Sequence, residues 1–344
     1  MNRIPVLLLT GFLGSGKTTI LNRLLAHKDF HDTAVIINEV GTVGVDHLLV
    51  ERGTEDVILL EGGCMCCAAR GSLSLALHRL MNRRRESTEM PFQRVILETS
   101  GLADPQPILQ SLIADGGFNR YAVPSGLVTV VDAVAAAHTL DAHPQAVSQV
   151  ALADLLLITK KDLVTPRARD QIESRLLSIN QGAPRIDVQF GDVDPTRVWL
   201  EKFGVASSWR SCGEEDSSTE AATFVSASRM FEGQLAREQL EFWLEHTMAL
   251  FGPSLLRFKG VLNIVESGAP VVIHGVQNFV HSPGTLKEWP AGARMNRMVL
   301  IGHDIDRQLL EDALTNLTKL ARNEGPAKPC FAGPGAFAKQ AYAE

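Results

Sequence analysis

The stretch GFLGSGKTT, residues 11–19, restricts the possible folds more than any other part of this sequence. Its Gly11, Gly16, Lys17 and Thr18 match G-x-x-x-x-G-K-[ST], in which backbone N–H groups converge on phosphate oxygens at a helix N-terminus. An apolar run precedes it and an amphipathic pattern follows, which is the strand–loop–helix order that the motif requires. We therefore predict a nucleotide phosphate site, with Lys17 at the β- and γ-phosphates and the Thr18 hydroxyl on Mg²⁺.

The first part of the chain alternates short apolar, β-branched runs with helical patterns. Near-continuous apolar runs are typical of strands that are buried on both faces of a parallel sheet. The alternation predicts an α/β fold, namely a P-loop NTPase core with a mainly parallel, doubly wound sheet. Strands are expected at 5–10, 33–40, 57–60, 94–99, 126–133 and 154–159, and helices at 18–27 and 71–84.

A segment rich in Ser, Glu and Gly, at 206–222, interrupts this pattern and is expected to be a linker. The order strand, helix, three strands, helix that follows it predicts a smaller α+β C-terminal domain. These elements are expected at 223–228, 233–250, 255–264, 269–277, 297–303 and 306–321. The resulting division is a nucleotide-binding domain over 1–205, a C-terminal domain over 223–324 and a flexible tail over 325–344. A length of 344 residues fits two domains at about 150 residues each.

The charge and hydropathy of the chain exclude several classes of partner. A net charge of −6 and an isoelectric point near 6.0 argue against a nucleic-acid binder. No apolar run reaches the roughly 18 residues of a membrane span, so no membrane partner is expected. Five cysteines, irregularly spaced, fit a reducing compartment, and we expect a cytoplasmic protein.

The segment LLLITKKDLV indicates which nucleotide binds. In many GTPases an N-K-x-D turn follows a buried strand, its Asp accepts hydrogen bonds from guanine, and its Lys stem lies along the base. Lys160 and Asp162 occupy those positions here, while Thr159 replaces the Asn. A capping Asp after a strand is the alternative, but the pattern favours GTP over ATP.

Two further segments carry carboxylates at strand ends. In RVILETSGLADP the strand ends at Glu98, which could hold Mg²⁺ directly or through water, and Gly101 would approach the γ-phosphate with its N–H group. Glu39 ends an earlier strand, where a nucleotide-sensing loop should begin. It could contact Mg²⁺ or a transition metal, or it could be a plain surface carboxylate.

Three of the five cysteines, Cys64, Cys66 and Cys67, crowd into the motif GGCMCC. A disulfide between the adjacent Cys66 and Cys67 would be strained, and structural cysteines usually occur singly. A soft-metal site that lacks only an outside ligand accounts for all three thiols and suits transfer better than permanent structure. Redox sensing and simple packing remain the alternatives.

The chain resembles the CobW-type family of P-loop GTPases in five segments that occur in the same order, namely GFLGSGKTT, INEVGTVGVD, GGCMCC, ILETSGLADP and ITKKD. Residues 223–324 resemble the C-terminal domain of that family. The resemblance implies GTP and GDP binding with slow hydrolysis, coupled to delivery of zinc, cobalt or iron to a metal-requiring client protein. It implies a transition-metal site at the three cysteines. It also implies that phosphate, switch and guanine contacts come from Gly14, Ser15, Gly16, Lys17, Thr18, Thr19, Glu98, Thr99, Ser100, Gly101, Lys160 and Asp162, with Thr159 as a departure.

The resulting hypothesis is a GTP-driven metallochaperone, monomeric or homodimeric, in which Lys17, Glu98 and Gly101 serve hydrolysis. Zinc is the expected cargo, with cobalt or iron as alternatives. Two other classes stay open at this point. One is an ATP-dependent P-loop kinase or ligase, which would prefer ATP over GTP. The other is a nucleotide-gated thiol redox sensor, which would release no phosphate and would form a reversible disulfide.

Overall fold

The structure is a computed structural model, and it describes most of the chain outside several loops and both ends. The described residues are 3–38, 57–60, 69–86, 92–114, 122–199, 224–276, 279–280, 283–289 and 294–323. Within them, the chain divides into two compact units, one over Met1–Leu177 and Ala183–Gly204 and the other over Ser178–Gly182 and Val205–Glu344. The predicted linker at 206–222 and tail at 325–344 lie outside the described residues, and the domain boundaries stay predictions.

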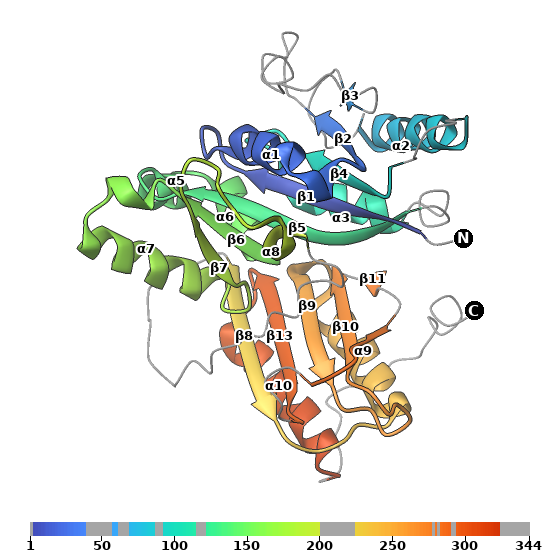
Figure 1. The fold of residues 1–344 in the computed structure, drawn as a ribbon. Helices are drawn as coiled ribbons and strands as arrows, with labels where there is room; N and C mark the ends of the chain where they lie inside the picture. The colour runs from blue at the N-terminus through green and yellow to red at the C-terminus, as the bar shows by residue number, and fades with distance from the viewer. Residues whose placement is uncertain are drawn as a thin grey trace. The chain divides into compact units, whose positions relative to one another are not determined.

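The first unit is built on a parallel sheet (Figure 1). Its described strands lie in the order β3-β2-β4-β1-β5-β6-β7, and each neighbouring pair among them is parallel. Their bounds are β1 Ile4–Gly11, β2 Thr33–Asn38, β3 Val57–Leu60, β4 Arg94–Glu98, β5 Ala122–Asp132, β6 Leu155–Thr159 and β7 Arg185–Val188. The predicted parallel α/β sheet is therefore confirmed.

Helices cover both faces of this sheet. Side chains of α1 and α8 pack with Leu7 and Leu9 in one buried cluster. Successive side chains of a strand point to opposite faces, so the fully buried Val6 and Leu8 lie on the other face, where α3 and α6 pack at β5 and β1. The helices are α1 Lys17–Ala26, α2 Ala69–Glu86, α3 Pro105–Ala114, α5 Ala136–Ala142, α6 Pro144–Ala151, α7 Pro166–Ile179 and α8 Pro195–Val198, with short 3₁₀ turns η1 Lys28–Phe30 and η3 Lys161–Leu163.

The sequence pattern missed one strand of this sheet. β7 lies at an edge of the sheet, and along its four residues Asp187 is exposed between the buried Ile186 and Val188. A strand of this length that alternates in burial does not give the continuous apolar run by which the central strands were recognised. The third predicted strand is observed with its predicted bounds, whereas β5 begins four residues before the predicted 126.

The second unit is an antiparallel sheet with two longer helices. Its described strands follow the order β11-β10-β9-β13-β8, with β12 paired to β10. The predicted order of strand, helix, three strands and helix is confirmed, while the two-residue strands β11 and β12 were not predicted. The bounds are β8 Phe224–Phe231, α9 Arg237–Phe251, η4 Gly252–Ser254, β9 Leu255–Leu262, β10 Val271–Val276, β11 Phe279–Val280, β12 Gly284–Thr285, β13 Asn296–His303 and α10 Arg307–Ala321.

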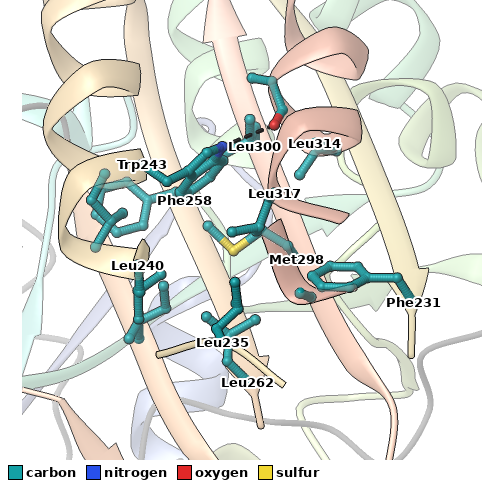
Figure 2. Close-up of a cluster of buried hydrophobic side chains, with 14 of the residues drawn as sticks. Phe231, Leu235, Leu240, Trp243, Phe258, Leu262, Met298, Leu300, Leu314 and Leu317 are labelled. Carbon is teal, nitrogen blue, oxygen red and sulfur yellow. Dashed lines mark hydrogen bonds between the residues drawn. The ribbon is translucent and has the colours of Figure 1, made fainter. Parts of the chain in front are cut away.

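The core of the second unit lies between one face of this sheet and the helices α9 and α10 (Figure 2). Phe258 from β9 and Met298 from β13 pack there with Trp243 from α9 and Leu317 from α10. The indole N–H of Trp243 donates a hydrogen bond of 2.9 Å to the carbonyl oxygen of Ala313, so its one polar atom is satisfied inside the apolar cluster. No described helix in either unit is long and apolar enough to cross a membrane.

Candidate functional site

The phosphate loop runs from the end of β1 to the start of α1. Gly11, Gly14 and Gly16 have φ values of 144°, 72° and 98°, which favour glycine over residues with a side chain. At Gly11 there is also no room, because an added Cβ would collide with the carbonyl oxygen of Val130. The Nζ of Lys17 donates to the carbonyl oxygens of Gly11 and Phe12, at 2.8 and 3.2 Å, so its charge lies within the loop.

Thr18 links the phosphate loop to β4, the neighbouring strand. Its hydroxyl donates a 3.0 Å hydrogen bond to Oε1 of Glu98, and one residue further Thr99 donates to Thr10 at 2.7 Å. Mg²⁺ takes oxygen ligands in octahedral geometry, where two adjacent ligands at about 2.1 Å from the ion lie about 3 Å apart. The Thr18 and Glu98 oxygens thus have the chemistry and the spacing of two adjacent Mg²⁺ ligands.

The segment after Glu98 is packed against the phosphate loop. An added Cβ at Gly101 would come 2.7 Å from the backbone nitrogen of Leu13, so only glycine fits this close approach. From α6, the buried Gln149 donates through Nε2 to the carbonyl oxygens of Gly101 and Ala103, at 3.2 and 2.9 Å. The backbone on both sides of Leu102 is therefore held in place by a side-chain amide.

Asp104 and Ser100 shape the two ends of the same segment. Oδ1 of Asp104 accepts from Ser148 of α6 at 2.8 Å and from the backbone of Gln106 at 3.0 Å, which ties the start of α3 to α6. Ser100 accepts through its carbonyl oxygen from Ala103 at 3.0 Å, which closes a turn around Gly101. The Glu98–Asp104 segment thus has contacts both to the phosphate loop and to α6.

The turn after β6 also bonds to the phosphate loop. Thr159, where an Asn is usual, donates from its buried hydroxyl to the carbonyl oxygen of Ser15 at 2.8 Å. Lys160, with a φ of 56°, donates to the carbonyl oxygen of Gly14 at 2.9 Å and to Asp132 at 2.6 Å. The threonine therefore still connects the expected base-reading turn to the phosphate loop.

Asp162 is exposed in this turn, and an ion-pair network fixes the residue before it. Lys161 donates to Glu173 of α7 at 3.0 Å and to Asp187 of β7 at 2.9 Å. Burial of the Lys161 ammonium lowers its pKa, but the hydrogen bonds to Asp187 and Glu173 outweigh this, so the pKa is raised above its ordinary value of 10.5. The turn is thereby anchored to two neighbouring elements while its carboxylate faces solvent.

A small cavity of about 30 Å³ lies behind the phosphate loop, with room for about one water molecule. Phe12 and Ser15 of the loop, Asp132 of β5 and Gln149 of α6 contribute to its lining. The Ser15 hydroxyl is buried without a hydrogen-bond partner among the described residues. Phe12 also stacks on His143, with ring centroids 4.5 Å apart, so the loop rests on the junction of α5 and α6.

The strand register places β3, the strand that precedes the cysteine motif in sequence, relative to this site. Leu9, Glu98, Ile37 and Leu59 form one row across β1, β4, β2 and β3. Adjacent strands lie about 4.8 Å apart, so the backbone of Leu59 is about 10 Å from that of Glu98. The GGCMCC motif follows in sequence, with Glu61 between it and Leu60, the last residue of β3.

Some of the predicted site residues cannot be compared with the structure. Glu39, Cys64, Cys66 and Cys67 lie outside the described residues. Among the residues that are described, no group of three or more His, Cys, Asp or Glu side chains could hold a metal ion.

The predicted residues that are described lie close together at the carboxyl ends of the parallel strands β1, β4 and β6. The phosphate loop contacts both the Glu98–Asp104 segment and the turn of Thr159 to Asp162. The sequence reasoning missed Asp132 and Gln149. Asp132 is the last residue of the buried strand β5. A carboxylate at the end of a buried strand is the signal by which Glu98 was predicted, so the same signal could have identified Asp132. Nothing in the local pattern of α6 marks Gln149, whose role depends on tertiary packing.

Comparison with protein families finds two matches that together span most of the chain. Residues 5–187 match the model described as the CobW/HypB/UreG nucleotide-binding domain. Residues 224–318 match the model described as the C-terminal domain of the cobalamin synthesis protein CobW.

The curated relatives include proteins that match nearly the whole chain. The zinc chaperone YjiA of Escherichia coli (strain K12) is 30% identical over 325 residues, which are 93% of this chain and 100% of the relative. The zinc chaperone CobW of a Sinorhizobium species is 28% identical over 359 residues, covering 92% of this chain and 97% of the relative. Among solved structures, the Zn(II)-bound YjiA GTPase from E. coli matches with a TM-score of 0.70 and 25% identity, over 92% of this chain and 99% of that one.

Proposed function

This chain belongs to the family of CobW, HypB and UreG nucleotide-binding proteins, and on that premise we propose that it is a GTPase that delivers zinc to a client protein. GTP is the substrate, zinc is the cargo, and the recipient is a protein that requires a metal. The names of the full-length relatives, zinc chaperones in two bacteria, support this assignment. So does the thiol-rich motif, since thiolates prefer zinc over magnesium or calcium.

The observation that carries the proposal is the contact between Thr18 and Glu98. It joins the phosphate loop to the strand end from which the Glu98–Asp104 segment starts. The same row of the sheet extends to β3, which the cysteine motif follows in sequence. A change at the γ-phosphate therefore has a short route, about 10 Å across two strand spacings, to β3, the strand that precedes the cysteine motif in sequence.

Each part of the site has a distinct role in this proposal. The backbone from Gly14 to Thr19 and the Lys17 ammonium bind phosphates, and Lys17 stabilises the charge that develops during hydrolysis. Thr18 and Glu98 would hold Mg²⁺, which neutralises phosphate charge when bound. Gly101 donates its backbone N–H to the γ-phosphate.

The turn after β6 selects the base. Asp162, exposed in that turn, accepts from guanine, while Thr159 and Lys160 fix the turn to the phosphate loop. A carboxylate accepts hydrogen bonds and cannot donate them, so it pairs with the donor edge of guanine. This supports GTP as the substrate.

Zinc binds through the thiolates of Cys64, Cys66 and Cys67, with further ligands supplied by the client or by another part of the chain. In the GTP state, contacts from the γ-phosphate order the Glu98–Asp104 segment and the loop that contains Glu39. Hydrolysis releases these contacts and shifts the zinc affinity. A tenfold shift needs about 1.4 kcal/mol of coupling, which is within the usual range for allosteric proteins.

Zinc affinity measured in both nucleotide states tests the proposal. The full chain is titrated with zinc against a chromophoric chelator, in the presence of GDP or of a non-hydrolysable GTP analogue. We expect about a tenfold difference in zinc affinity between the two states. The variant that combines Cys64→Ser, Cys66→Ser and Cys67→Ser should bind zinc more weakly in both states and lose the difference.

A matched control is the double variant Cys212→Ser and Cys330→Ser, which changes the other two cysteines and should behave as the wild type. If the triple variant kept the affinity and the nucleotide dependence of the wild type, the thiolates would not be the zinc site and the proposal would be wrong. Competition between ATP and GTP in the same assay checks the substrate, since a preference for ATP contradicts it.

A further inference from the structure

A tight turn follows β7 at the edge of the first sheet. Gln189 and Asp192 form an isolated antiparallel bridge, and the backbone N–H of Asp192 donates to the carbonyl oxygen of Gln189 at 2.8 Å. The two residues between them, Phe190 and Gly191, have φ values of 50° and 76°. Positive φ at both central positions is the signature of a type I′ turn.

Phe190 is unfavourable at this position for two independent reasons. The first central residue of such a turn is usually Asn, Asp or Gly, because other side chains disfavour the left-handed backbone region. Its side chain is also 83% exposed, the highest value among the large hydrophobic side chains of the described residues. Neither backbone preference nor burial explains the phenylalanine. Strained residues of this kind indicate a functional contact.

The turn lies beside the base-reading residues. β7 pairs with β6 so that Val188 is opposite Thr159. The two strands are parallel, so the segments that follow them leave the sheet on the same side, at the carboxyl ends of the strands. Phe190 follows two residues after Val188, while Lys160 to Asp162 follow Thr159 directly. The ion pair between Lys161 and Asp187, at 2.9 Å, joins the two segments.

Gly191 fixes the other side of the turn to α1. An added Cβ there would lie 3.0 Å from Cγ2 and 3.1 Å from the carbonyl oxygen of Thr19. Thr19 follows Thr18 at the phosphate end of α1, so the turn lies between the start of that helix and the segment of Lys160 to Asp162. A guanine whose phosphates occupy the loop and whose edge reaches Asp162 passes through this region.

We infer that the ring of Phe190 packs against one face of the guanine base of bound GTP or GDP, opposite the aliphatic stem of Lys160. The inference rests on the proposed function, since it takes a guanine nucleotide as the ligand. Aromatic side chains stack on bases through their π faces. The contact therefore contributes to affinity for the base and leaves the phosphate contacts unchanged.

The test compares GDP with inorganic tripolyphosphate, which has the phosphates and lacks the base. Binding of each to the full chain, with Mg²⁺, is measured by isothermal titration calorimetry. Phe190→Ala should weaken GDP binding about tenfold, equal to about 1.4 kcal/mol, and leave tripolyphosphate binding within about twofold of the wild type. Phe190→Trp should restore GDP binding. Phe242→Ala removes another exposed phenylalanine, 59% exposed on α9, and should change neither ligand.

Phe190→Asn separates a role in binding from a role in folding. Asparagine suits the left-handed backbone, so this variant should unfold at the same or a higher temperature than the wild type while its GDP affinity falls. If both Phe190→Ala and Phe190→Asn bound GDP as the wild type does, the inference alone would be overturned. Wild-type protein that bound tripolyphosphate but neither GDP nor GTP would overturn the proposed function as well.

Discussion

In the first unit, buried polar side chains at the ends of β1, β4 and β6 bond to other elements, while in the second unit an apolar cluster fills the space between the sheet and its helices. Thr10, Glu98 and Thr159 are each less than 8% exposed, and each bonds to a residue of another element. Around Trp243, by contrast, the partners are Phe258, Met298 and leucines, with one hydrogen bond to Ala313 (Figure 2).

The difference indicates what each region contributes. Hydrogen bonds between neutral groups contribute little net stability, about 1 kcal/mol each, whereas a buried large side chain contributes several times that. The polar strand ends of the first unit therefore fix the positions of the candidate site residues, with a modest gain in stability. The apolar core of the second unit contributes stability, and its side chains carry no groups that would bind a nucleotide. Substitutions in the two regions should accordingly separate binding from folding.

The largest effect is expected from Trp243→Ala. Removing this buried side chain leaves a cavity in the apolar core, and should lower the free energy of unfolding of the second unit by about 3–5 kcal/mol. Chemical denaturation of the full chain measures it, with Phe242→Ala on the same helix as the exposed control. GDP affinity below the transition should stay at the wild-type value. A parallel loss of GDP affinity would break the separation between the two regions.

A smaller effect, in binding rather than folding, is expected from Thr159→Val. The change keeps the shape of the side chain and removes the hydrogen bond to the carbonyl oxygen of Ser15. The turn of Thr159 to Asp162 is then less well fixed to the phosphate loop, so GDP should bind about five- to tenfold more weakly. Calorimetric titration measures this. The matched control in the second unit is Thr318→Val, whose hydroxyl bonds to Leu314 within α10. Equal effects of both variants on GDP binding would contradict the prediction.

The smallest effect is expected from alkaline pH at Lys161. The pKa of this lysine is raised in the folded protein, so its ion pairs stabilise the fold fully below the ordinary pKa of 10.5 and lose this contribution as the pH rises through the higher folded value. Wild-type protein should therefore lose thermal stability above about pH 10.5 more steeply than Lys161→Met. Melting temperatures at a series of pH values compare the two, and identical slopes would exclude a role for the network.

Much of the fold could be predicted from local pattern. The strands β1 to β6 were identified from continuous apolar runs, because a strand that is buried on both faces of a sheet has apolar residues at nearly every position. The phosphate loop was found from four fixed positions, since its chemistry depends on glycines and one lysine close in sequence. β7 and the two-residue strands of the second unit could not be found this way, because β7 alternates in burial and two residues are too few to form a pattern.

The site was predictable only in part. Lys17, Glu98 and Asp162 stood at positions that a motif or a strand end marked, and Asp132 could have been found by the same rule. Gln149 could not, because an amide in a helix carries no pattern that distinguishes a surface residue from one that holds two carbonyl oxygens of a distant segment.

The sequence alone determined the class of sheet, the order of its elements and the nucleotide chemistry, since each of these depends on the period of apolar residues or on groups a few positions apart. Tertiary structure decided which groups meet. Thr18 reaches Glu98 across 80 residues, and Thr159 reaches Ser15 across 144. Such contacts depend on strand order and register, which place the ends of parallel strands at one edge of the sheet and are set only when the whole sheet forms.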